Sequence, residues 1–172
     1  MSRATLLVTI AVSALSCSIA TADGEVGAVP DQKSFIDGKV SDYMERRCGM
    51  LDCHGQEGRP LRLFSEWGLR LEADKNGQRV AKATTQAERV ANYRAVVSLE
   101  PEELAKCYDT KGEDYTLLQL LKKPLSLENG GMRHKGGPVL TDAEDDNGWK
   151  CLFGWASGAV DATACAEASK VQ

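Results

Sequence analysis

The stretch CGMLDCHG at residues 48–55 places two cysteines, a histidine and a glycine close together. The adjacent pair Cys53 and His54 matches the end of the C-x-x-C-H site through which c-type haem is attached to a protein. In such a site each cysteine thiol adds to a haem vinyl group, and the histidine becomes an axial ligand of the iron. Here four residues instead of two separate Cys48 from Cys53. The loop between the cysteines must therefore bulge if both sulfur atoms are to reach one macrocycle.

Two other interpretations of this stretch stay open at the level of the sequence. Cys48 and Cys53 could form a disulfide, in which case His54 is an ordinary loop histidine. The three side chains could instead bind zinc, although a structural zinc site usually takes four ligands. The motif favours haem first, the disulfide second and zinc last.

The N-terminus has the features of a secretory signal peptide. Arg3 supplies the positive charge, residues 4–15 form an apolar run too short to span a bilayer, and residues 20–22 (Ala-Thr-Ala) are a small-x-small cleavage site. We therefore expect a signal peptide over residues 1–22, a mature chain that begins at Asp23, and a location in the periplasm or cell envelope. A lipid anchor at Cys17 is a weaker alternative, because the residues before it fit a lipoprotein signal poorly.

The composition excludes several classes of function. The chain has 172 residues and a net charge of −4, and no basic patch stands out, so nothing predicts nucleic acid or anionic lipid as a partner. No later stretch is long and apolar enough to predict a transmembrane span. We find no phosphate-binding loop, nucleophile elbow or paired-carboxylate motif.

Export also decides the state of the cysteines, because thiols outside the cytoplasm end as disulfides or covalent attachments. If Cys48 and Cys53 hold haem, the mature chain has three others: Cys107, Cys151 and Cys165. We favour a disulfide between Cys151 and Cys165, which would tie the last helix to the C-terminal tail. The other two pairings stay open.

The apolar periodicity predicts a mostly helical domain. A helix capped by Ser34 should deliver the chain to Cys48 along one apolar stripe of Ile36, Val40, Tyr43 and Met44. Four more helices are expected. The first begins at the capping box at 85–88 and has Val90, Tyr93 and Val97 on one face, and the second begins at Pro101 and carries Cys107. The third is a buried helix over 115–121, and the fourth begins at a second capping box at 141–144 and ends near Gly158. Residues 161–169 should add a helical turn or two.

An extended segment should follow the haem motif. Residues 60–64 and 68–71 alternate apolar and basic side chains, which is the period of extended chain and predicts a short hairpin or a pair of extended loops. A turn is expected at 74–77. Arg62 and Arg70 could approach haem propionates, although two solvated arginines are the commoner outcome.

The loop over residues 126–140 offers a second axial ligand. It carries four glycines around Met132 and His134, and glycines let a backbone approach a macrocycle closely. His134 is the only histidine besides His54, and a methionine ligand would give a higher reduction potential than a second histidine. The alternative is that His134 is a polar loop residue and Met132 a core residue.

Several short motifs follow one another over residues 34–158: CHG at 53–55, LRL at 61–63, LLKKPL at 120–125, GGMRHKGG at 130–137, and Trp155. In this order they resemble the planctomycete-type cytochrome c-like domains of exported bacterial proteins. The resemblance implies a mostly helical haem module for electron transfer in the cell envelope, with Cys48 and Cys53 as attachment cysteines and His54 as proximal ligand. The distal ligand varies in that family, and the His-x-Gly-Gly run favours His134 over Met132.

We therefore expect an N-terminal arm over residues 23–33 and a cytochrome c-like helical domain over 34–172 that carries one covalent haem c. Electrons would pass to a redox partner protein of the cell envelope, and six-coordinate iron would leave no open site for an enzymatic substrate. An apolar haem pocket should be lined by Leu117, Leu120, Trp149 and Phe153. The main alternative is an exported, disulfide-stapled helical binding module without haem, and a minor one is a haem peroxidase or sensor with an open distal site.

Overall fold

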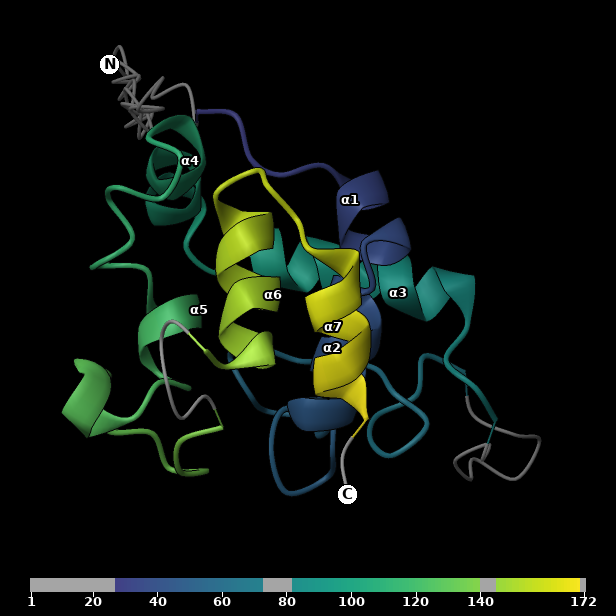
Figure 1. The fold of residues 1–172 in the computed structure, drawn as a ribbon. Coiled ribbons are helices and arrows are strands. Elements are labelled where there is room, and N and C mark those ends of the chain that lie inside the picture. The colour runs from purple at the N-terminus through teal and green to yellow at the C-terminus, as the bar shows by residue number, and fades with distance from the viewer. Residues whose placement is uncertain (1–26, 73–81, 140–144, 171–172) are drawn as a thin grey trace, which may run out of the picture.

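The computed structural model describes residues 27–72, 82–139 and 145–170. This part of the chain is mostly helical, as predicted, and contains no β-strand. The elements are α1 (Gln32–Asp37), α2 (Val40–Arg47), α3 (Gln86–Val97), α4 (Pro101–Asp109), α5 (Gln119–Lys122), the 3-10 turn η1 (Leu127–Asn129), α6 (Asn147–Ala156) and α7 (Ala162–Ser169). Helices α6 and α7 lie side by side at the front of the molecule, and α3 crosses behind them (Figure 1).

The first predicted helix is divided in two, so the prediction of one continuous helix is wrong. Asp31, and not Ser34, caps α1 by accepting a hydrogen bond from the Ser34 N–H. The break lies at Gly38 and Lys39, where Lys39 adopts a left-handed φ of 65°. A Cβ atom at Gly38 would lie 2.7 Å from the Val160 side chain, so the glycine lets the segment after α6 pack into the bend.

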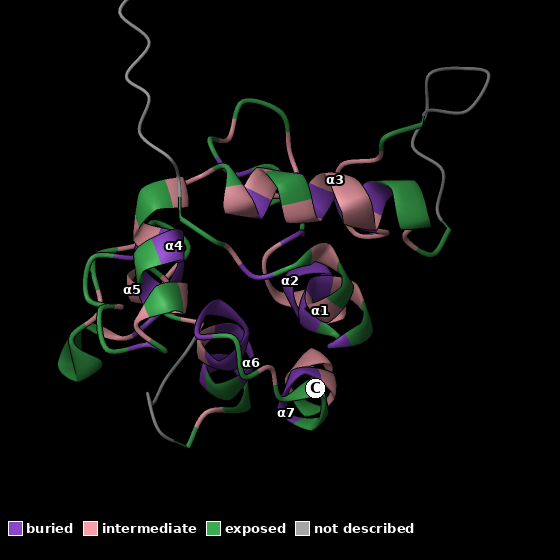
Figure 2. Cartoon of the chain, turned by 90° about the horizontal axis from the view of Figure 1, so that it is seen from above, coloured by how far each residue is buried: buried purple, intermediate pink, exposed green. Residues whose placement is uncertain are grey.

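The core forms where α1 and α2 meet α6 and α7. The ring of Phe35 contacts Trp155 edge-on, with 5.2 Å between ring centroids, and lies 5.8 Å from Tyr93. Helix α6 ends in a Schellman motif, since the Gly158 N–H donates to Trp155 O and the Ala159 N–H to Gly154 O. Gly158 is thus the predicted stop, and Trp155 of α6 packs on Phe35 of α1. Figure 2 shows buried residues concentrated in α2 and α6.

The disulfide between Cys151 of α6 and Cys165 of α7 confirms the pairing that the sequence favoured. The two cysteines are 14 residues apart, and closing a loop of this length stabilises a protein by about 3 kcal/mol. We expect the double change Cys151→Ala with Cys165→Ala to lower the free energy of unfolding by about that amount. Urea unfolding with and without reductant measures it. Reduced wild type should match the variant, and equal stability of all three samples would show that the bridge adds nothing.

Helix α3 presents a polar face to the core, which the sequence analysis missed. Its capping box between Thr85 and Glu88 forms as predicted. Its buried residues, however, are Glu88, Asn92 and Val96, whereas the predicted face of Val90, Tyr93 and Val97 is only half-buried. The Asn92 amide pairs with both the N–H and the C=O of Phe64, and Glu88 accepts two hydrogen bonds from Arg70.

These polar contacts explain why the predicted hairpin does not form. Within the described residues, 60–72 contains only one isolated bridge, between Phe64 and Leu69. The Asn92 and Glu88 side chains satisfy backbone groups of Phe64 and Leu71 that a partner strand would otherwise satisfy. Leu61 and Leu63 still point into the core, as the alternation predicted. In the second stretch it fails, because Leu71 is 49% exposed and the Arg70 side chain is buried against Glu88.

The ion pair between Glu88 and Arg70 makes the free energy of unfolding depend on pH. Burial alone would raise the pKa of Glu88, but hydrogen bonds from Arg70, Thr85 and Leu71 lower it to about 2. Because the unfolded chain takes up this proton at higher pH, the stabilisation is present above about pH 4.5 and is lost as the pH falls toward 2. We expect Glu88 to account for about 3 kcal/mol of that loss. Urea unfolding from pH 6 to pH 2 should show it in wild type and not in Glu88→Gln, and identical pH dependence would contradict it.

Some of the remaining helices begin or end where the sequence predicted, and others do not. Helix α4 starts at Pro101 and buries Cys107, and α7 covers the expected Ala-rich tail. The helix over 115–121 shortens to α5, and Leu117 is 63% exposed. Helix α6 begins at Asn147, where the Asp146 side chain accepts from the Gly148 and Trp149 N–H groups. The predicted signal peptide with Cys17, the turn at 74–77 and the capping box at 141–144 lie outside the described residues.

Candidate haem site

The loop that carries the two cysteines begins where α2 ends. Cys48 is the C-cap of α2, and the His54 N–H returns to donate to Cys48 O at 2.9 Å. The Cys53 and Gly55 N–H groups both donate to Met50 O. The residues inserted between the cysteines bulge outward, since Met50 is 39% and Leu51 52% exposed. The wide spacing therefore still brings Cys48 and Cys53 to the wall of one cavity.

Close backbone packing holds this loop in place. Carbonyl O of Gly49 accepts a hydrogen bond from the Ser65 hydroxyl. A Cβ atom at Gly55 would lie 2.1 Å from that oxygen, and one at Gly68 would lie 1.9 Å from it. Only glycine fits at these two positions, so the segment around Ser65 fixes the loop that presents His54.

The His54 ring is held in one tautomer. Its Nδ1 lies 3.0 Å from Leu61 O, and because a carbonyl can only accept, Nδ1 carries the proton. Burial lowers the pKa of His54, and the nearby charges of Arg59 and Lys123 lower it further, so the ring is neutral at pH 7. No described residue bonds to Nε2, whose lone pair is free to bind a metal.

His134 lines the same cavity and has the same arrangement. Its Nδ1 lies 3.0 Å from Gly137 O, so it too carries the proton there and leaves Nε2 without a described partner. The loop is tied to the end of α5, since the Met132 N–H donates to Lys122 O and the Val139 N–H to Pro124 O, each at 2.9 Å. Gly137 takes a φ of 77° in the turn that reaches back to His134.

The two imidazole rings are matched in position. Their centroids are 6.0 Å apart and their planes differ by 11°, which is too far for the rings to touch. Two metal–nitrogen bonds of about 2 Å, together with the two ring radii, span about 6 Å. The space between His54 and His134 therefore has the length that one iron atom with two axial histidines requires.

The cavity around the two rings has a volume of about 430 Å³, which is in the range of small-molecule and cofactor sites. Besides Cys48, Cys53, His54 and His134, its wall is mainly aliphatic: Met44, Pro60, Leu61, Leu99, Leu120, Pro124, Val139 and Leu152. Both cysteines carry free thiols. Burial raises the pKa of the Cys48 thiol to about 12, with the neighbouring Cys53 adding to the effect, so this thiol is protonated at neutral pH.

Of the predicted pocket residues, only Leu120 lines the cavity. Leu117 faces solvent, while Trp149 and Phe153 stack on each other and on Tyr115 elsewhere in the core. Leu152, which lies between them in α6, lines the cavity instead. Met132 is 43% exposed and lies outside the cavity wall, so His134 is the distal candidate that the structure brings to His54.

The two arginines considered for propionates are not at the cavity. Arg62 is exposed, and Arg70 forms an ion pair with Glu88 at 2.8 Å. The sequence analysis missed the basic residues that do line the wall, namely Arg47, Arg59, Lys123, Arg133 and Lys135. Four of them could have been predicted from the sequence, because each lies within five positions of Cys48, His54 or His134. Lys123 is the exception.

Comparison of the chain with family models, curated proteins and solved structures gave no match. Within the described residues, no three or more His, Cys, Asp or Glu side chains are grouped so that they could hold a metal ion. A haem iron takes four ligands from the macrocycle and needs only two from the protein.

None of the helices in the described ranges is long and apolar enough to cross a membrane.

Proposed function

We propose that this chain is a single-haem, c-type cytochrome-like electron-transfer protein of the periplasm or cell envelope. His54 and His134 are its axial ligands, and Cys48 and Cys53 are its attachment cysteines. The observation that carries the proposal is the pair of imidazoles with 6.0 Å between centroids, each fixed by a backbone carbonyl at Nδ1. A histidine that binds a metal through one ring nitrogen usually donates a hydrogen bond from the other.

The remaining residues of the cavity suit such a role. The aliphatic wall, including Leu61, Leu120 and Leu152, excludes water and keeps the local dielectric low. A bound haem would supply an iron that cycles between the ferrous and ferric states. Because histidines occupy both axial positions, the site leaves no coordination position for a substrate, and we propose no enzymatic reaction. The disulfide between Cys151 and Cys165 is consistent with an oxidising compartment.

Two features favour this proposal over the stapled binding module. That alternative needs a disulfide between Cys48 and Cys53, whereas both thiols are free and line the same cavity. It also gives no role to the two histidines, whose ring centroids lie 6.0 Å apart. The zinc interpretation would need further ligands beside these residues.

The test is a visible spectrum and a denaturing intact mass of the full chain, exported from a host competent in cytochrome c maturation. A sharp reduced α-band and the added mass of one haem are the expected results. A colourless protein whose mass shows only the loss of thiol hydrogens would overturn the proposal and support the stapled module. A coloured protein whose iron binds carbon monoxide at once would support an open distal site instead.

A further inference from the structure

The cavity wall has a large excess of positive charge. Five cationic side chains line it: Arg47, Arg59, Lys123, Arg133 and Lys135. Among the described residues none of them forms a salt bridge. The single acidic side chain of the wall, Glu100, already accepts a hydrogen bond from the Leu120 N–H at 3.2 Å. In a chain of net charge −4, this local excess indicates that the cavity receives an anionic ligand.

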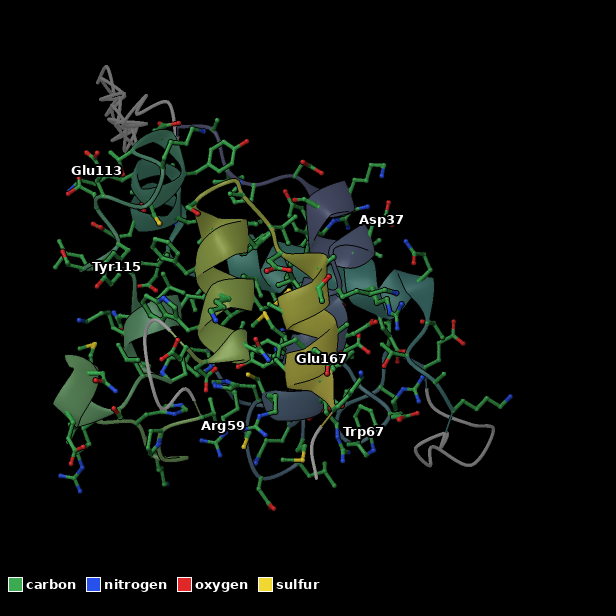
Figure 3. All side chains as sticks on the ribbon, viewed as in Figure 1. Asp37, Arg59, Trp67, Glu113, Tyr115 and Glu167 are labelled. Carbon is green, nitrogen blue, oxygen red and sulfur yellow. A yellow bond between two sulfur atoms is a disulfide. The ribbon has the colours of Figure 1, made fainter. Side chains whose placement is uncertain are left out.

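Arg59 is the clearest member of this group. Its Nε atom is buried and has no hydrogen-bond partner among the described residues. A guanidinium cannot lose its proton, so it needs an acceptor, and a buried donor without one is costly. The buried Arg70 is fully paired with Glu88 by comparison. Figure 3 shows Arg59 below α6.

Lys123 is a second cation of the cavity wall that lies near His54. It follows α5 and adjoins Pro124, whose carbonyl holds the loop of His134. Both Lys123 and Arg59 lie close enough to His54 for their charges to act on its ring. Arg47, in contrast, adjoins Cys48 and donates to Val139 O at 3.4 Å, so its guanidinium already has an acceptor.

We propose that Arg59, together with Lys123, binds the carboxylates of the cofactor, so that the cavity selects a tetrapyrrole with ionised carboxylates on one edge. This inference rests on the proposed haem function and adds the residues that recognise the ligand. A planar guanidinium can hold a carboxylate by two parallel hydrogen bonds. The carboxylate would also supply the acceptor that the buried Nε lacks.

The test compares haemin with its dimethyl ester, which has the same ring and iron but no ionised carboxylate. Binding is made reversible in the full chain by changing Cys48→Ala and Cys53→Ala, and is followed by the Soret band. In that background we expect Arg59→Gln to weaken haemin binding by about tenfold or more and ester binding by less than about twofold. Arg62→Gln is the matched control, because Arg62 is exposed on the same segment, and it should change neither affinity.

Each outcome has a distinct meaning. Equal losses for haemin and the ester would show that Arg59 only supports packing, and no loss for either would show that it does not contact the ligand; both results overturn the inference. Failure of the exported wild type to carry haem would instead overturn the proposed function. If only the reversible variant fails to bind, the midpoint potential of the exported protein decides: Arg59→Gln should shift it to more negative values and Arg62→Gln should not. An unchanged potential in Arg59→Gln would also overturn the inference.

Discussion

Replacing His54 with alanine is expected to abolish the low-spin haem spectrum of the exported protein. The His54 ring is held by Leu61 O, and it lines one cavity together with the two cysteines and His134. The chain has only two histidines, so no other imidazole can replace it. The absorbance of the reduced α-band per mole of protein measures the effect. A normal low-spin spectrum in His54→Ala would contradict the assignment of His54 as an axial ligand.

The distal ligand is tested by a pair of variants in one loop. We expect His134→Ala to leave five-coordinate, high-spin iron that binds carbon monoxide rapidly, because the alanine opens one axial position. Met132→Leu is the matched control, since Met132 is 43% exposed and outside the cavity wall, and its spectrum should match wild type. If Met132→Leu is the variant that opens the iron, the loop rearranges on haem binding and methionine is the distal ligand.

The features that the sequence predicted well are coded by neighbouring residues. The capping box of Thr85 and Glu88, the start of α4 at Pro101 and the stop at Gly158 each depend on contacts within a few positions. Such signals hold in the structure because the backbone groups that they satisfy belong to the same turn or helix end.

The features that the sequence missed depend on residues far apart in the chain. Apolar periodicity placed Leu117, Trp149 and Phe153 at the haem, but Leu117 faces solvent and the two rings pack on Tyr115. Hydrophobicity shows that a residue can be buried, and it does not show which of two apolar regions will bury it. The polar face of α3 was missed because Glu88 and Asn92 are buried only by pairing with a segment about 20 or more residues earlier.

Arg59 shows that the sequence also does not predict which charged residue binds the ligand. In the sequence it is one basic residue among 21, and Arg62 and Arg70 appeared equally suited to propionates. Only the structure shows that Arg70 is already paired with Glu88 and that the Arg59 Nε is buried without an acceptor. The search for ligand-binding charges therefore depends on which cations the fold leaves without a partner.

Changing both Cys48 and Cys53 to alanine is expected to remove all covalent attachment and to leave the axial ligands in place. The thiols would form the bonds to the macrocycle, whereas His54 and His134 are positioned by the backbone carbonyls of Leu61 and Gly137. The protein should then bind added haemin with a low-spin spectrum, but its denaturing mass should lack haem. The control is Cys107→Ala, because Cys107 is buried in α4 away from the cavity wall, and this variant should keep covalent haem.

The single cysteine variants test whether the wide spacing allows two attachments. Both thiols line one cavity because the residues between them bulge toward solvent, with Leu51 52% exposed, while the His54 N–H closes the loop onto Cys48 O. We therefore expect Cys48→Ala and Cys53→Ala each to retain haem through the one remaining thioether, with an α-band at longer wavelength than wild type, because one vinyl group stays unreacted. Intact mass and the pyridine haemochrome spectrum measure this. A wild-type haemochrome band that already matches one of the single variants would show that only one cysteine reacts.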